Sequence, residues 1–216
     1  CQYVADFRSV VQPQIYSFDN YCCWSGTSIH STYFANLYNV RANAMAAQKP
    51  FWSFVNTMAF GAMRLPTQAD IYFCVNTALS YGAKGIEYFT YVRPTVGGFT
   101  AGGMVDAAGN KQSQYTYVQN ANKQIAAVDE VLMCCLYKGL MKAGSTPATI
   151  PDNCLTSYGP CTKFTASHGI MGCFDYNGGY AYYVTNNSVT ANDTFTATLT
   201  GKSGYVIYGA GSKANW

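Results

Sequence analysis

The residues best suited to chemistry are two carboxylates at or near the ends of short apolar segments. Asp19 directly follows one such segment, and Glu87 lies inside another. Carboxylates serve as general acids, general bases and nucleophiles. A carboxylate inside an apolar strand is costly to bury alone, so Glu87 needs a partner or a cavity. Asp19 and Glu87 are therefore the candidate catalytic residues. Asp19 also fits a capping role in an Asp-Asn turn, and Glu87 also fits an ion pair with Lys84 or Arg64.

Aromatic and polar side chains accompany these carboxylates along the chain. Aromatics make up 16% of the 216 residues, and Tyr alone occurs 19 times. Flat aromatic faces suit the C–H surfaces of sugars, although core packing is the commoner role of a large aromatic side chain. Polar side chains at strand ends suit sugar hydroxyls. The substrate-binding candidates are Trp24, Trp52, Asn56, Thr57, Tyr91 and Arg93.

The candidates depend on an alternation of strand and helix in the first half of the chain. Strand-like segments occupy Gln14–Phe18, Phe51–Asn56 and Gly85–Tyr91. Helix-patterned segments separate them, from about Thr32 to Gln48 and from Pro66 to Gly82. Such alternation predicts a parallel sheet, which places its chemistry at the carboxyl ends of the strands.

The other segments of this half are simpler to interpret. A helix over residues 1–12 precedes the first strand, and Thr67 and Asp70 have the spacing of a capping box. Thr57–Leu65 is expected to be a loop. Val96–Gly103 is rich in Gly but lacks the Gly-Lys-Ser/Thr ending of a phosphate-binding loop, so it is expected to be a flexible connection. Asp106–Gly109 is a predicted turn.

The second half begins with a predicted long helix over Ser113–Lys142. Gly, Pro, Ser and Thr then dominate residues 143–160, which are expected to be a linker. The linker would separate an α/β domain (1–142) from a sandwich-like antiparallel β domain (161–216). Asn177-Gly178 gives a strong hairpin signal. The strand-like runs of this tail are Gly169–Tyr176, Gly179–Asn186, Thr194–Thr200 and Tyr205–Tyr208.

Composition narrows the classes of function and partner. Only 11% of the residues are charged, and the formal net charge of +3 comes without a basic run, which disfavours nucleic-acid binding. No apolar run is long enough to span a bilayer. The uncharged polar surface fits an extracellular or cell-surface bacterial protein, with a cytoplasmic one as the alternative. Cys1 stands first, which fits a processed secreted protein or a truncated reading frame.

The nine cysteines do not form a recognisable metal or disulfide pattern. None belongs to a CxxC motif, and only two His residues are present, so neither a metal site nor a cofactor is expected. Cys74 and Cys134 or Cys135 fall in helical patterns and are expected to be buried. Cys154 and Cys161 enclose a Pro/Gly-rich loop, where either a disulfide or two free thiols are compatible with the sequence.

Four short motifs resemble the carboxyl-terminal half of the (β/α)8 barrel of retaining glycoside hydrolases, family 42 in particular. Phe18-Asp-Asn-Tyr21 resembles the end of barrel strand six, where Cys22 replaces the Pro of that family. Lys49-Pro-Phe-Trp52 resembles the opening of strand seven, and residues 82–91 resemble strand eight. Gly103-Met-Val-Asp-Ala-Ala-Gly109 is similar to the segment before helix eight. The likeness covers residues 10–142 and implies a partial barrel holding its last three strand–helix units.

The resemblance implies a protein acting on the O-glycosidic bonds of carbohydrates, in the manner of a β-galactosidase. Retaining glycosidases use two carboxylates about 5 Å apart. The family places its acid/base at strand four, which this chain lacks, and its nucleophile where Val55 and Asn56 stand here. The alternatives are a non-catalytic carbohydrate-binding barrel and an inactive fragment. A half-barrel exposes sheet edges, so we expect pairing with the missing half or with a second copy of the chain.

Overall fold

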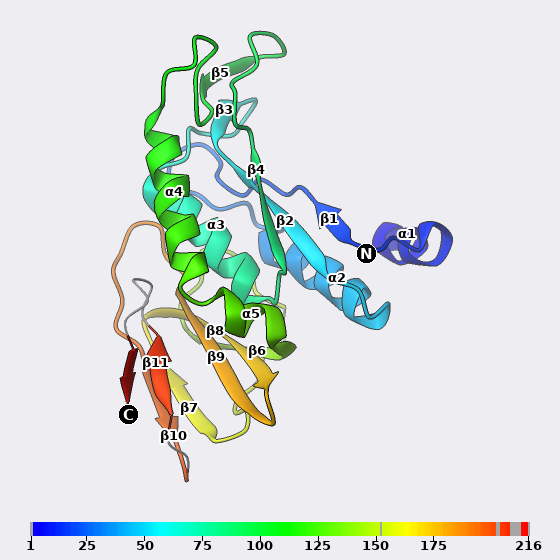
Figure 1. Cartoon of the computed structure of the whole chain (residues 1–216), viewed down its shortest axis with the longest axis vertical. Helices are drawn as coiled ribbons and strands as arrows, with labels where there is room; N and C mark the ends of the chain where they lie inside the picture. Colours follow the sequence, from blue (N-terminus) through cyan, green and yellow to red (C-terminus); the bar gives the residue numbers. More distant parts are fainter. Residues whose placement is uncertain (1, 152, 202–203, 208–212, 216) are drawn as a thin grey trace.

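The protein combines a parallel α/β region with antiparallel sheets, as the computed structural model shows for residues 2–151, 153–201, 204–207 and 213–215 (Figure 1). Helix α1 (Gln2–Val11) comes first. Strands β1 (Tyr16–Phe18), β2 (Phe51–Asn56) and β4 (Gly85–Phe89) then form one parallel sheet in that order. Helices α2 (Tyr33–Ala46) and α3 (Gln68–Ser80) connect the strands. The predicted parallel sheet is therefore confirmed, and within the described residues it does not close into a barrel.

The helices cover one face of the parallel sheet. Alternate residues of a strand point to opposite faces. Phe51 and Val55 of β2 are buried in the main core together with side chains of α2 and α3, such as Leu37 and Ile71. Trp52 and Phe54 therefore point to the other face and are half-buried.

Helix α3 begins and ends as its sequence predicts. Thr67 and Asp70 form a reciprocal capping box, in which each side chain bonds the backbone N–H of the other residue. Gly82 follows the helix with φ +84°, a left-handed conformation that favours glycine. Most residues of α3 are buried, which is typical of a helix packed between two layers.

A three-stranded antiparallel sheet forms the second layer against α3. Its strands are β6 (Leu136–Gly144), β8 (His168–Tyr176) and β9 (Gly179–Asn186), in the order β6-β8-β9. Strands β8 and β9 both contact α3, so this helix lies between the parallel and the antiparallel sheet (Figure 1). The main hydrophobic core consequently runs from the parallel sheet through α3 to Ile170 of β8.

The predicted long helix over Ser113–Lys142 is wrong in its second half. Helix α4 spans Ser113–Ala126, the short α5 spans Asp129–Cys134, and β6 follows at once. The register with β8 shifts between Tyr137 and Gly139, so Leu136 is exposed while Leu140 is buried, and the segment lacks the alternation that marks a strand in a sequence. Pairing with β8 decides for the strand. The antiparallel sheet thus starts before residue 143, while the domain limits themselves stay a prediction.

The other antiparallel strands largely match the sequence. Tyr176 pairs with Gly179, and Asn177 and Gly178 have positive φ, so the Asn-Gly hairpin is confirmed. Strand β10 (Thr196–Leu199) and strand β11 (Tyr205–Ile207) fall within predicted runs, and Tyr208 lies outside the described residues. Two further strands were not predicted: β7 (Cys161–Thr165) pairs with β10, and β12 (Lys213–Asn215) pairs with β11.

Two segments expected to be loops form a small sheet beyond the carboxyl ends of the parallel strands. Strand β3 (Met58–Phe60) pairs with strand β5 (Phe99–Gly102) in antiparallel register. Gly102 has φ +87°, and a Cβ there would lie 2.5 Å from the carbonyl oxygen of Thr57. The glycine permits a close backbone approach, so a flexible Gly-rich connection is the wrong description of this segment.

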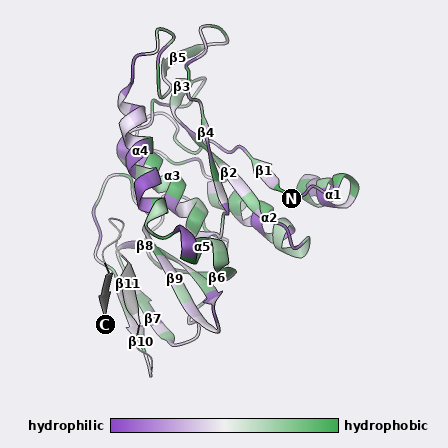
Figure 2. Cartoon of the chain, in the orientation of Figure 1, coloured by the Kyte–Doolittle hydropathy of each residue, from purple (hydrophilic) through white to green (hydrophobic). Residues whose placement is uncertain are grey.

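The outer surface is polar where the helices face solvent. The visible side of α4 is mainly hydrophilic in Figure 2, and its buried residues are Gln114, Val118 and Ala121. None of the described helices has the length and apolar character needed to cross a membrane.

Candidate functional site

The face of the parallel sheet opposite α2 and α3, here called the open face, carries the candidate catalytic Glu87. In the strand register, Ser17 lies beside Trp52, Phe54 beside Glu87, and Asn56 beside Phe89. Paired residues of parallel strands point to the same side of the sheet. The open face therefore gathers one carboxylate, one hydroxyl and several aromatic rings.

Glu87 is half-buried and accepts a hydrogen bond from the hydroxyl of Ser17, two strands away. The alternative ion pairs with Lys84 or Arg64 are not formed in the described part of the chain. The ammonium group of Lys84 donates to the carbonyls of Leu132 and Cys135, and Arg64 pairs with Asp70. Among the described residues, Glu87 therefore forms no ion pair, and its hydrogen-bond partner is the Ser17 hydroxyl.

The side chain of Tyr21 lies within electrostatic reach of both candidate carboxylates. Burial raises the pKa of its hydroxyl well above the ordinary value, and the nearby charges of Asp19 and Glu87 raise this pKa further. The phenol is therefore protonated at any physiological pH and can donate a hydrogen bond. Asp19 itself is exposed after β1. The sequence motif Phe18-Asp-Asn-Tyr21 contains Tyr21, but nothing in its spacing indicates that Tyr21 lies near Glu87.

An aromatic cluster borders this group of residues. The ring of Tyr21 stacks on Phe89 with 5.9 Å between centroids and meets Phe60 edge-on at 5.5 Å. Phe99 packs against both Phe60 and Phe89. All four rings are half-buried, so they offer an apolar wall next to the carboxylates. Phe60 and Phe99 escaped sequence analysis because both lie in segments expected to be loops.

The two predicted tryptophans lie in different settings. Trp52 is half-buried on the open face, and its indole covers Gly85, where a Cβ would lie 2.6 Å from the ring. Trp24 lies in the loop after β1, 4.4 Å from the ring of His30, and its indole nitrogen is buried without a hydrogen-bond partner. A sugar-stacking role for either ring stays a prediction.

Asn56 and Thr57 hold the ends of two strands together. The Asn56 amide donates to the carbonyl of Met58 at 2.7 Å and accepts from its N–H at 2.9 Å. The Thr57 hydroxyl donates to the carbonyl of Thr90 at 3.0 Å. Their exposed fractions are 3% and 0%. A direct sugar contact would require these bonds to break, so the geometry favours a positioning role for both residues.

Tyr91 and Arg93 follow β4 at the same end of the sheet. The Tyr91 side chain is more than half exposed. The Arg93 backbone N–H donates to the carbonyl of Val105, and its charge contributes to lowering the pKa of Asp106. Both side chains are accessible from solvent at least in part, and their contact with a substrate stays a prediction.

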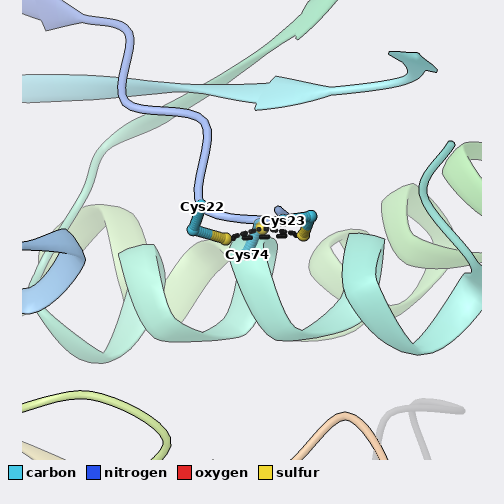
Figure 3. Close-up of side chains that lie close together, drawn as sticks. All are labelled: Cys22, Cys23 and Cys74. Atoms are coloured by element: carbon cyan, nitrogen blue, oxygen red, sulfur yellow. Dashed lines mark hydrogen bonds between the residues drawn. The ribbon is translucent and has the colours of Figure 1, made fainter. Parts of the chain in front are cut away.

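A second group of functional side chains was missed by the sequence analysis. The thiols of Cys22, Cys23 and Cys74 converge beneath the parallel sheet (Figure 3). Burial of Cys74 is confirmed, as is that of Cys135, whereas Cys134 is exposed. No disulfide joins Cys154 and Cys161, which decides between the two alternatives left by the sequence.

A scan against protein-family models matched no family, and a search of curated proteins found no matching relative. The function of this chain is therefore inferred from its own residues and their geometry.

Proposed function

We propose that the protein is glycoside-hydrolase-like and acts on the O-glycosidic bonds of carbohydrates at the open face. The observation that supports this proposal is that Asp19 and Glu87 both lie near enough to Tyr21 to raise the pKa of its hydroxyl, beside an aromatic wall that includes the Tyr21 ring. Sugars require both kinds of group, since hydroxyls bind polar side chains and C–H faces stack on rings. Glycosidic cleavage in turn requires two carboxylates at one site.

Each residue of the site has a definite role in this proposal. Ser17 fixes one oxygen of Glu87 by a hydrogen bond and leaves the other oxygen for the reacting sugar. Asp19 supplies the second carboxylate from the end of β1, two strands away from Glu87. Tyr21 stays protonated and donates its hydroxyl hydrogen to whichever oxygen carries negative charge.

The arrangement of the sheet also supports a barrel of the (β/α)8 type. Strands β1, β2 and β4 are parallel, follow chain order and alternate with helices, which is the repeating pattern of such barrels. Several candidates lie at or beyond the carboxyl ends of these strands, as in barrel enzymes, namely Asp19, Asn56, Thr57, Tyr91 and Arg93, whereas Glu87 lies in the middle of β4 and Trp52 near the start of β2. In the proposed architecture, further strands join the free edges of β1 and β4, supplied elsewhere or by a second copy of the chain.

A second candidate function is carbohydrate binding without turnover. In the family that the sequence resembles, the nucleophile stands at the strand end occupied here by Asn56. The Asn56 amide cannot act as a nucleophilic carboxylate, and both of its polar atoms already bond the backbone of Met58. This observation favours a barrel that holds sugar but does not cleave it.

The two functions are separated by measuring hydrolysis and binding on the same protein. The full chain is assayed on a panel of aryl glycosides, β-galactosides first, and titrated calorimetrically with the corresponding oligosaccharides. For the enzyme we expect Glu87→Gln to lower the rate by about a hundredfold or more, because an acid–base or electrostatic group is lost. Glu130→Gln, on the exposed surface of α5, is the matched control.

The outcomes decide the proposal as follows. Hydrolysis that falls in Glu87→Gln but persists in Glu130→Gln supports the enzyme, provided that circular dichroism shows both variants folded. Saturable sugar binding without hydrolysis supports the non-catalytic alternative. An unchanged rate in Glu87→Gln removes this residue from the site, and the absence of both binding and hydrolysis overturns the proposed function.

A further inference from the structure

Three cysteine thiols from two separate elements meet in the protein interior. Cys22 and Cys23 belong to the segment after β1, and Cys74 lies in the middle of α3. Figure 3 shows the side chains of Cys22 and Cys23 turning from either side toward Cys74. The Sγ atom of Cys74 lies 3.0 Å from that of Cys22 and 3.9 Å from that of Cys23, and the adjacent pair are 3.5 Å apart.

These separations are close to those of sulfur ligands around one metal ion. With metal–sulfur bonds of about 2.3 Å, tetrahedral geometry places sulfurs about 3.8 Å apart. Two of the three distances differ from this value by a few tenths of an ångström. Only the Cys22–Cys74 pair needs to open by somewhat less than 1 Å, a shift that small side-chain rotations provide.

The chemistry of the site selects a soft cation. Each sulfur is buried, with exposed fractions of 1%, 1% and 7% for Cys22, Cys23 and Cys74. Thiolate ligands favour Zn²⁺ and Cu⁺ over hard cations such as Mg²⁺ and Ca²⁺. Among the described residues, the group contains no fourth Cys, His, Asp or Glu. Three protein ligands with one open position are an arrangement that zinc sites use.

Charge decides between a divalent and a monovalent ion. Three thiolates leave a net charge of −1 around a divalent cation and −2 around a monovalent one, and buried net charge is costly. The Arg64 backbone N–H donates to the Cys23 carbonyl, and its guanidinium donates to the carbonyl of Trp24, the next residue, so this cation borders the cluster. Its guanidinium is already paired with Asp70, one helical turn before Cys74, so little positive charge is left to offset the cluster.

We infer that Cys22, Cys23 and Cys74 form a binding site for one thiophilic divalent metal ion of the zinc class. The ion ties the segment after β1 to helix α3. It therefore holds Tyr21 and Asp19, which immediately precede Cys22, in position relative to the sheet. The inference is independent of what the open face binds.

The test uses the full chain, purified with reductant and freed of metal with a chelator. Titration with Co²⁺ is followed by the visible absorption of tetrahedral thiolate coordination, and Zn²⁺ is then added to displace it. Titration with Cd²⁺ gives an ultraviolet sulfur-to-cadmium band whose intensity counts the thiolate ligands. We expect one ion per chain, three thiolates and displacement of Co²⁺ by Zn²⁺.

Two serine substitutions locate the site. Cys74→Ser should weaken metal binding by about a hundredfold or more, since it removes a direct ligand. Cys173→Ser changes another fully buried thiol in β8, outside the cluster, and should leave the affinity unchanged. If Cys74→Ser is unfolded by circular dichroism, Cys22→Ser and the thiolate count of the unsubstituted chain take its place.

Three results would overturn the inference. The first is that the reduced chain takes up no metal. This result overturns the inference also when mass spectrometry finds a Cys22–Cys74 disulfide in protein isolated without reductant. The second is uptake of Cu⁺ without Zn²⁺, Co²⁺ or Cd²⁺, because a monovalent ion is then preferred. The third is equal affinity in folded Cys74→Ser and Cys173→Ser.

Discussion

At the scale of single residues, Asp70 shows how one side chain fixes several segments. Its carboxylate is 1% exposed and accepts hydrogen bonds from the Arg64 guanidinium and from both the N–H and hydroxyl of Thr67. Arg64 in turn donates to the carbonyls of Trp24 and Ser28. The start of α3 and the loop after β1 are therefore joined through one buried ion pair.

Replacement of Asp70 should destabilise the protein strongly. In Asp70→Ala, the Arg64 charge stays largely buried without its partner, and the capping box is lost. We expect the free energy of unfolding to fall by about 3–5 kcal/mol, as for other buried pairs that lose one member. Urea denaturation followed by circular dichroism measures this change.

The control is Lys138→Ala, which breaks an ion pair with Asp175 whose two side chains are nearly half exposed. This substitution should leave the urea midpoint almost unchanged. Equal effects of the two substitutions would contradict the role given to burial.

At the scale of elements, the sequence reveals structure wherever local signals agree with the final packing. Helix α3 has its capping box, its apolar stripe and its terminal Gly82 within one continuous segment, so both ends are predictable. The Asn177-Gly178 hairpin is predictable for the same reason. Strand β6 is not, because its irregular register leaves no clean alternation in the sequence and only pairing with β8 selects the strand. Strands β3 and β5 likewise need each other, since each is short and lies among turn residues.

The predicted turn at Asp106 allows a prediction on pH. The Asp106 carboxylate accepts from the side chain and backbone N–H of Asn110 and from the N–H of Ala108, and these bonds lower its pKa below the ordinary value. Because the folded pKa is depressed, the carboxylate stabilises the fold above about pH 4 and loses this effect as the pH falls through the folded pKa.

The measurement compares urea midpoints of the unsubstituted chain and Asp106→Ala from pH 7 down to pH 2. We expect the unsubstituted chain to be more stable at pH 7 and the difference to close on acidification. Asn110→Ala removes one of the hydrogen bonds to Asp106. At pH 7, the urea midpoint of this variant should therefore lie between those of the unsubstituted chain and Asp106→Ala. A difference that stays constant with pH would show that the charged form of Asp106 does not matter.

At the scale of the whole molecule, both candidate sites depend on contacts between residues far apart in the chain. Glu87 was found from the sequence because a carboxylate inside an apolar strand is conspicuous by itself. Its neighbours Ser17 and Tyr21 come from β1 and from the segment after it, and the packing of β1 in the sheet brings them close. Cys22 and Cys23 are adjacent, but Cys74 lies 51 positions after Cys23. Their convergence follows from the packing of α3 beneath the sheet and has no local signal.

The same helix makes the two sheets parts of one packed body. The Ser80 hydroxyl lies 2.7 Å from that of Thr185 in β9, and the Tyr183 hydroxyl donates to the Asn76 side chain at 2.6 Å. A Cβ on Gly172 of β8 would lie 2.2 Å from the Ser80 carbonyl oxygen. The antiparallel sheet therefore approaches the backbone of α3 as closely as a glycine allows.

Gly172→Ala should accordingly weaken α3 and the antiparallel sheet together. The added methyl group must push the sheet away from the helix, at a cost of about 3 kcal/mol. Gly179→Ala, whose Cβ would have its nearest neighbour at 3.5 Å, should change stability by no more than about 0.5 kcal/mol.

Hydrogen exchange of Gly172→Ala, read by mass spectrometry, shows whether the two layers respond together. If peptides from α3 and from β8–β9 lose protection to the same extent, the two layers unfold as one unit. Loss confined to β8–β9 would instead show an independent β domain, as the composition of residues 143–160 predicts, because α3 then keeps its packing on the parallel sheet when the second layer detaches.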